Sequence, residues 1–115
     1  MRLVSCAAAG LATGAGRALG ALVGDEVVAL GRAAVLLGRP EAEAARLATL
    51  ETMLDSWHEQ LALAREGLAE AATPAGATAT AIARRPFDSL SILPPVAHPP
   101  AFRDAYCFEE HVKNA

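Results

Sequence analysis

The chain has 115 residues, of which 53% are hydrophobic and only 4% are aromatic, and its formal net charge is −3. This length suits one domain, whose core must be built from Leu, Val and Ala side chains. The ten Lys and Arg residues are scattered and are not interleaved with aromatic side chains, so we expect no nucleic-acid partner.

Cysteine usage and the N-terminal apolar stretch indicate the compartment. Cys6 and Cys107 lie far apart without a Cys-x-x-Cys pair, which fits a reducing environment better than a disulfide framework. Residues 3–12 are too short to span a membrane and, with one preceding arginine, make a weak signal peptide. We therefore expect a cytoplasmic protein with no membrane partner.

The first thirty residues predict a β-meander. Leu3 to Ala7 is a short strand candidate, and the glycines between 10 and 16 indicate a loop. Two apolar runs, 19–23 and 26–30, flank Gly24-Asp25, which is typical of a hairpin because glycine there accepts a positive φ.

A glycine-rich stretch within this region, Thr13 to Gly20, resembles the phosphate-binding turn of dinucleotide-binding folds. That turn requires a strand before it and a helix after it. Only about ten residues lie between these glycines and the hairpin turn at Gly24-Asp25, which leaves little room for a helix. In addition, Ala18 stands where the short-chain dehydrogenase pattern has glycine. Dinucleotide binding is kept as a lesser alternative, and it predicts a helix starting at Gly16.

Residues 31–72 change to a helical period. A short helical turn is expected over 33–37, ended by Gly38 and Pro40. From Glu41 to Ala72 we expect one long helix or two shorter ones, with a break near Ser56, which with Glu59 matches a capping box. An apolar stripe runs along this region and comprises Leu47, Leu50, Leu54, Trp57, Leu61, Ala64 and Leu68.

This stripe has two interpretations. The first is that it forms the core face of the helices, with Trp57 packed inside and His58 on the surface. The second is a small helical interaction module that dimerises through the Leu47–Leu68 stripe and therefore exposes it. The two differ in whether the stripe is buried within one chain.

The last part of the domain is irregular. We expect a loop over 71–80 and a strand over 89–93, while Arg84 and Arg85 form a solvated pair or bind an anion. The prolines of residues 94–101 exclude helix and central strand and predict a stiff linker, with His98 as a linker residue. The predicted organisation is an α+β N-terminal domain over 1–93, with three to four short strands, a linker over 94–101 and a new domain from 102 to 115.

The segment after the linker concentrates chemically useful side chains. Asp104 and His111 are seven residues apart, so on a helix they share one face, whereas Tyr106 lies about 160° away from Asp104. A carboxylate and an imidazole held together bind a divalent metal and act as a general base. The plain alternative is that Asp104 is an N-cap, that Phe108 and Val112 form a buried pair, and that His111 is a surface histidine.

Residues Arg103-Asp-Ala-Tyr-Cys-Phe-Glu-Glu-His-Val112 resemble the start of the catalytic domain in the fumarylacetoacetate hydrolase family, whose pattern is roughly Arg-Asp-Phe-Tyr-x-Phe-Glu-x-His. The proline-rich segment 93–100 resembles that family's inter-domain segment. Met1 to Ser5 and Gly24 to Val28 are similar to its N-terminal domain. Ala105 departs from the pattern, which usually has an aromatic residue there.

The resemblance implies an enzyme that splits a carbon–carbon bond in 1,3-dioxo acids, or decarboxylates or isomerises related oxo acids, with bound Mg²⁺ or Ca²⁺. It implies Asp104 as a metal ligand, Tyr106 as a substrate contact and His111 as the general base. The partners it implies are the oxo-acid substrate and the remaining catalytic domain. A second copy of the chain, in a homodimer, is a further expected partner.

The family's other metal ligands, a Glu-x-Glu pair and a later Asp, are expected beyond these 115 residues. One Asp does not satisfy Mg²⁺ or Ca²⁺, which take six or more oxygen ligands. We therefore expect the chain to be an N-terminal fragment of its parent enzyme, with no metal bound and no activity alone.

Overall fold

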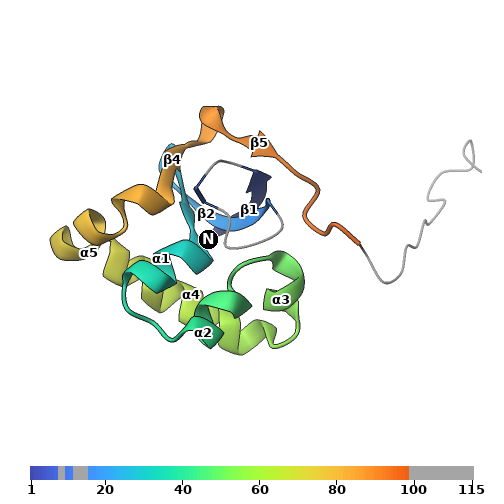
Figure 1. Ribbon diagram of the computed structural model, residues 1–115, viewed down its shortest axis with the longest axis horizontal. Coiled ribbons are helices and arrows are strands. Elements are labelled where there is room, and N and C mark those ends of the chain that lie inside the picture. Colours follow the sequence, from blue (N-terminus) through green and yellow to red (C-terminus); the bar gives the residue numbers. More distant parts are fainter. Residues whose placement is uncertain (8–9, 12–15, 99–115) are drawn as a thin grey trace, which may run out of the picture.

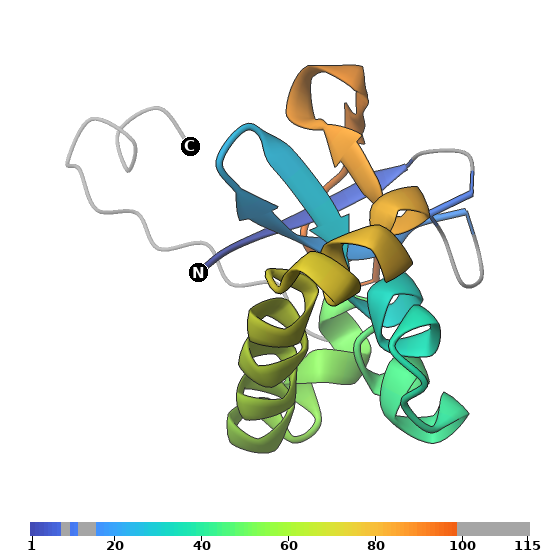
Figure 2. The same ribbon diagram turned by 90° about the vertical axis from the view of Figure 1, so that its left-hand side faces the viewer.

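The computed structural model describes residues 1–7, 10–11 and 16–98, which form one antiparallel sheet with helices packed on one face (Figure 1 and Figure 2). The predicted α+β class is confirmed. The sheet has the strand order β4-β3-β2-β1-β5. The strand bounds are Arg2–Ala7 for β1, Ala18–Val23 for β2, Glu26–Ala29 for β3, Arg84–Pro86 for β4 and Ser91–Ile92 for β5.

The predicted meander is the centre of this sheet. Strands β2 and β3 pair antiparallel, and Val23 lies opposite Glu26 next to the turn. Gly24 in this turn has φ 60°, a value that glycine adopts without steric cost. Strand β1 pairs antiparallel with β2, with Arg2 opposite Leu22. The hairpin signal at Gly24-Asp25 therefore predicted the local structure correctly.

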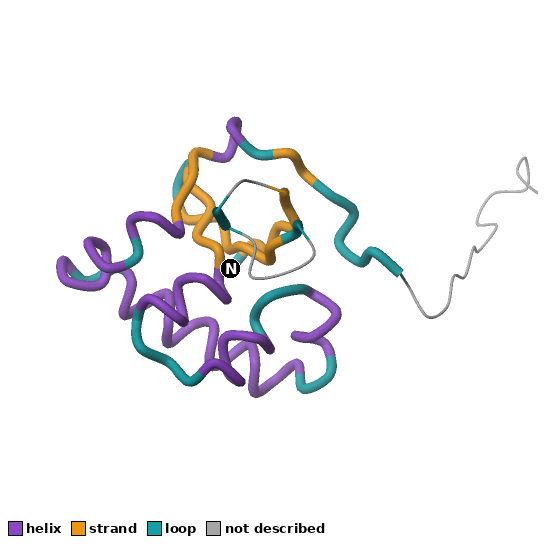
Figure 3. The backbone as a smooth tube through the Cα atoms, viewed as in Figure 1, coloured by secondary structure: helices purple, strands orange, loops and turns teal. Residues whose placement is uncertain are grey.

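Two edge strands come from a segment far along the chain. Strand β4 pairs with β3, and β5 pairs with β1, so the described residues form a sheet of five strands instead of the expected three or four. The strand expected over 89–93 is reduced to Ser91–Ile92, because residues Phe87–Ser89 form a 3-10 helix, η2. Figure 3 shows residues 84–92 passing over the open side of the curled sheet.

In the part of the chain that the structure describes, five α-helices follow the meander or precede the edge strands. They are α1 Leu30–Leu36, α2 Glu41–Arg46, α3 Leu50–Leu54, α4 Trp57–Ala71 and α5 Pro74–Ala79. Residues 41–72 thus form three helices, where one or two were predicted. The predicted break at Ser56 is present, since Ser56 is the N-cap residue of α4, but its side chain makes no capping hydrogen bond to the described chain.

A capping box forms one helix earlier instead. The Thr52 amide donates to Thr49 Oγ1 at 3.2 Å, and the Thr49 amide donates to Thr52 Oγ1 at 3.3 Å. Threonine at the third helical position replaces the Glu or Gln of the usual pattern. The extra helix boundary at Thr49 follows from this reciprocal bonding.

The loop predicted for 71–80 is wrong over Pro74–Ala79, which is helix α5. Thr73 caps this helix, because its Oγ1 accepts a hydrogen bond from the Gly76 amide at 3.1 Å. Pro74 occupies the first helical position, where its missing N–H costs nothing. Proline, glycine and threonine here mark a helix start and not a loop.

The core has two main parts, one on each face of the sheet. Between sheet and helices lie the buried side chains Leu19, Ala21, Leu30, Ala34, Ala44, Leu47, Met53 and Ala64. Inside the curl, on the other face, lie Cys6, Leu11, Ala18, Val27 and Ala29, with Leu90 packed against them. Alternating residues of β2 supply both parts, as expected for a strand buried on two faces.

Candidate functional site

The three predicted site residues, Asp104, Tyr106 and His111, lie outside the described residues. The structure does describe the approach to them, residues 93–98, which in Figure 1 extend along the domain from β5.

The first half of the proline-rich segment is hydrogen-bonded to the domain. The Leu93 amide donates to the Ser5 carbonyl at 2.9 Å, which continues the β1–β5 pairing by one bond. Ser5 Oγ donates to the Pro95 carbonyl at 2.9 Å, and Arg17 Nη2 donates to the Pro94 carbonyl at 2.6 Å. Both proline carbonyls are therefore satisfied by side chains of the domain.

The second half is held by a carboxylate. The Ala97 amide donates to Glu51 Oε1 at 2.6 Å. This hydrogen bond is the main cause that lowers the pKa of the Glu51 carboxyl, and the nearby Arg17 guanidinium also favours the charged form. Glu51 lies in the first turn of α3, where the helix dipole suits a negative charge.

Ser5, Arg17 and Glu51, here called the clasp, come from three separate parts of the fold. Ser5 lies on β1, Arg17 immediately precedes β2, and Glu51 lies on α3. None of these three residues was predicted from the sequence as a site residue. Only the tertiary fold brings the three together, so no local pattern would have found them.

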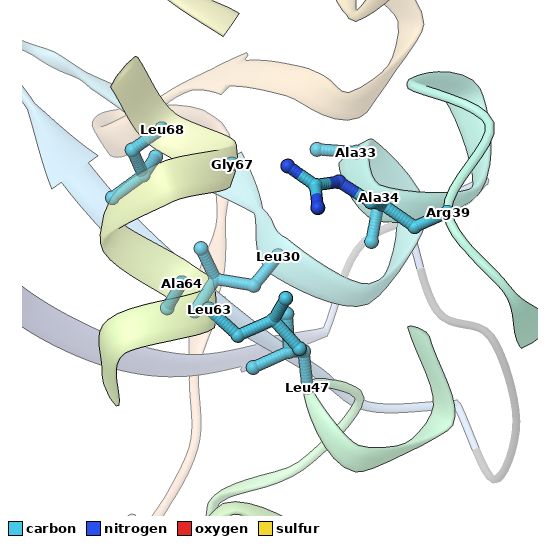
Figure 4. Close-up of a pocket in the computed structure, with 9 residues that line it drawn as sticks. All are labelled: Leu30, Ala33, Ala34, Arg39, Leu47, Leu63, Ala64, Gly67 and Leu68. Atoms are coloured by element: carbon cyan, nitrogen blue, oxygen red, sulfur yellow. The ribbon is translucent and has the colours of Figure 1, made fainter. Parts of the chain in front are cut away.

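An apolar pocket lies between α1 and α4, far from this segment in the sequence (Figure 4). Its lining includes Leu30, Leu47, Leu63 and Gly67, and its cavity volume of about 10 Å³ is on the scale of one water molecule. Figure 4 shows the Arg39 side chain reaching toward α4, where its guanidinium pairs with Glu70 at 3.2 Å. The pocket is a packing defect and not a ligand site.

Within residues 1–7, 10–11 and 16–98 there is no group of three or more His, Cys, Asp or Glu side chains that would hold a metal ion. Glu41 and Glu43 on α2 repeat a Glu-x-Glu spacing, but residues two apart on a helix point about 200° from each other.

The arginine pair 84–85 is structural in the domain. Arg84 donates to the Ala71 carbonyl at 2.8 Å and lies 3.8 Å from Glu26 Oε2. Arg85 Nη1 donates to the Ile82 carbonyl at 3.2 Å. Backbone carbonyls therefore engage both guanidinium groups, in place of the solvated pair expected from the sequence.

The dinucleotide-binding hypothesis and the helical-interaction hypothesis each predict a specific structural feature. After Gly16 the chain enters strand β2 at Ala18, so the helix that a dinucleotide site requires at Gly16 does not form. In the apolar stripe, Leu47 and Ala64 are buried in the core, and Trp57 packs against it. Of the stripe residues, Leu54 is the one that is highly exposed, at 52%. The stripe is mostly used for packing within the chain.

No protein-family model, curated protein or solved structure matches this chain. In the described part of the chain, no helix has the length and apolarity required to cross a bilayer.

Proposed function

We propose that the chain is the N-terminal part of a metal-dependent hydrolase or isomerase of the fumarylacetoacetate hydrolase family, acting on 1,3-dioxo or 2-oxo acids in the cytoplasm. The observation that carries the proposal is the segment 103–112, in which Arg, Asp, Tyr, Phe, Glu and His follow the family's order and spacing. Support comes from its context, because an α+β domain and a proline-rich segment precede it.

The proposed roles follow from the side-chain chemistry. Asp104 would supply one carboxylate oxygen to Mg²⁺ or Ca²⁺, which are hard cations that prefer oxygen ligands. The bound cation would supply positive charge that polarises the substrate oxygens. His111, as a neutral imidazole, would take a proton from water, and Tyr106 would donate a hydrogen bond to the substrate.

The proposed donor set is too small for the cation. Among the three proposed site residues, only Asp104 is a metal ligand, whereas Mg²⁺ and Ca²⁺ need six or more oxygen ligands. We therefore expect no turnover of an acylpyruvate in Mg²⁺ by this polypeptide alone. Measurable turnover by the purified chain would contradict the proposed division of the active site.

The reading frame after codon 115 provides the direct test. A frame that continues into a Glu-x-Glu pair supports the proposal, and the longer protein is then assayed with an acylpyruvate and Mg²⁺. We expect His111→Ala to lower kcat by at least about 10²-fold, which is the usual contribution of a general base. Asp104→Asn should lower activity by weakening the binding of the cation, because it removes a carboxylate ligand. Glu110→Gln is the matched control and should retain activity. Unchanged activity in His111→Ala would exclude the proposed mechanism.

A further inference from the structure

Several backbone groups of the proline-rich segment have no hydrogen-bond partner in a sheet or helix. Individual side chains of the domain form hydrogen bonds with them instead. Pro94 and Pro95 have no N–H, so their carbonyls are the only hydrogen-bonding groups they present. Arg17 and Ser5 donate to these carbonyls, at 2.6 and 2.9 Å. The next bonded group has the opposite polarity, because the Ala97 amide donates to Glu51 at 2.6 Å.

The charges of the clasp match the polarity of the groups that they bind. The Arg17 cation contacts carbonyl oxygens, and the Glu51 anion contacts an N–H group. Charge-assisted hydrogen bonds of this kind are about twice as strong as neutral ones. Because proline already restricts the backbone to an extended conformation, ordering this segment costs little conformational entropy.

The three clasp residues lie in, or directly before, regular secondary structure. Ser5 is 7% exposed and lies on β1, which is paired with β2 on one side and with β5 on the other. The Leu19 amide, at the start of β2, donates to the Ala48 carbonyl at 2.9 Å. This bond ties the strand that follows Arg17 to the turn that precedes α3, so Arg17 and Glu51 are held relative to each other.

We propose that Ser5, Arg17 and Glu51 are positioning residues that clasp the backbone of residues 94–97 and fix the point where the chain leaves the domain. Segment 103–112 begins six residues after Ala97. The domain would then orient the proposed catalytic motif instead of being joined to it by a free linker. This role for the motif rests on the proposed function, whereas the clasp itself does not.

Amide hydrogen exchange of the full chain, followed residue by residue by NMR, tests the clasp. The Ala97 amide should be protected in the wild-type chain, and Glu51→Ala should reduce that protection by about tenfold or more. Glu59→Ala, an exposed carboxylate on α4, is the matched control and should leave Ala97 unchanged. Arg17→Ala should lower the protection several-fold, because the Pro94 carbonyl loses its donor and the Pro95 carbonyl keeps only the hydrogen bond from Ser5. The Val28 amide, in the sheet core, reports whether each variant is folded.

A second measurement needs no substitution. In the wild-type chain, the chemical shift of the Ala97 amide proton should titrate with the Glu51 carboxyl, moving upfield as the acceptor is protonated. An unprotected Ala97 amide, or a shift that does not follow Glu51, would overturn the proposal. A protected Ala97 with no Glu-x-Glu in the downstream frame would retain the clasp and reject the proposed function. An unprotected Ala97 amide together with a Glu-x-Glu pair in the downstream frame would reject the clasp and retain the proposed function.

Discussion

Two glycines in helices provide a sharp test of the packing, because the same substitution should have opposite effects at the two positions. Gly67 lies inside α4, and a Cβ placed there has no described atom within 4 Å. Gly31 lies in α1, where a Cβ would approach the Ala44 carbonyl oxygen to 2.9 Å and the Ala48 Cα to 3.2 Å. Both of these neighbours are backbone atoms of the segment that begins with α2, and they cannot rotate away.

The expected magnitudes follow from this geometry. Gly67→Ala should raise the free energy of unfolding by about 1 kcal/mol, the difference in helix propensity between alanine and glycine. For a chain of this size, that corresponds to a rise in Tm of about 4 °C. At Gly31 the same propensity gain is opposed by overpacking, which costs about 1–3 kcal/mol, so we expect a net loss of roughly 1 kcal/mol.

The assay is urea unfolding, followed by the fluorescence of Trp57, which is the single tryptophan and packs against the core. The two variants have identical composition, and each removes the same entropy from the unfolded chain. Their difference therefore reports the folded environment alone. Equal stabilisation by Gly31→Ala and Gly67→Ala would refute the close approach of α1 and α2.

Three further predictions concern the core, a helix cap and a carboxylate. Met53→Ala should lower the free energy of unfolding by about 2–5 kcal/mol in urea, because Met53 is fully buried in the larger core. Its exposed neighbour Leu54 is the control, and a similar loss in Leu54→Ala would contradict the described burial. Thr49→Ala should cost about 1 kcal/mol by the same assay, since it removes the capping box of α3, and an unchanged midpoint would show that the box does not stabilise the helix. The pKa of the Glu51 carboxyl is lower in the folded chain than its ordinary value of 4.5. The ionised carboxylate therefore stabilises the folded chain at pH values above 4.5, and this stabilisation is lost as the pH falls through the lower pKa of the folded chain. The difference in unfolding free energy between wild type and Glu51→Gln should therefore be constant near neutral pH and shrink below about pH 4.5, whereas a difference that grows in acid would have the wrong sign.

Some elements of this fold are specified by neighbouring residues, whereas others depend on contacts between distant parts of the chain. Gly24-Asp25 between two apolar runs predicted the β2–β3 hairpin, because the turn and both strands are encoded within about twelve neighbouring residues. Gly38 and Pro40 likewise marked the end of α1. These elements depend on backbone preferences that each residue has wherever it occurs.

The helices of residues 41–79 were only partly predictable. Helical composition was evident, but the boundary at Thr49 depends on a threonine–threonine capping box, and α5 begins at a Thr-Pro pair that also fits a loop. In both places the local signal allows two structures. Packing of these short helices against α4 decides between them, because each is too short to be stable alone.

The sequence by itself determined the α+β class, the central meander and the polar motif at 103–112, since these depend on spacing along the chain. Only the tertiary structure decided that residues 84–92 supply both edge strands and that Ser5, Arg17 and Glu51 meet at one segment. Residues 5 and 51 are distant in the sequence, and nothing in either local pattern specifies the other. Their proximity results from burying the two faces of one sheet, which is a property of the whole chain.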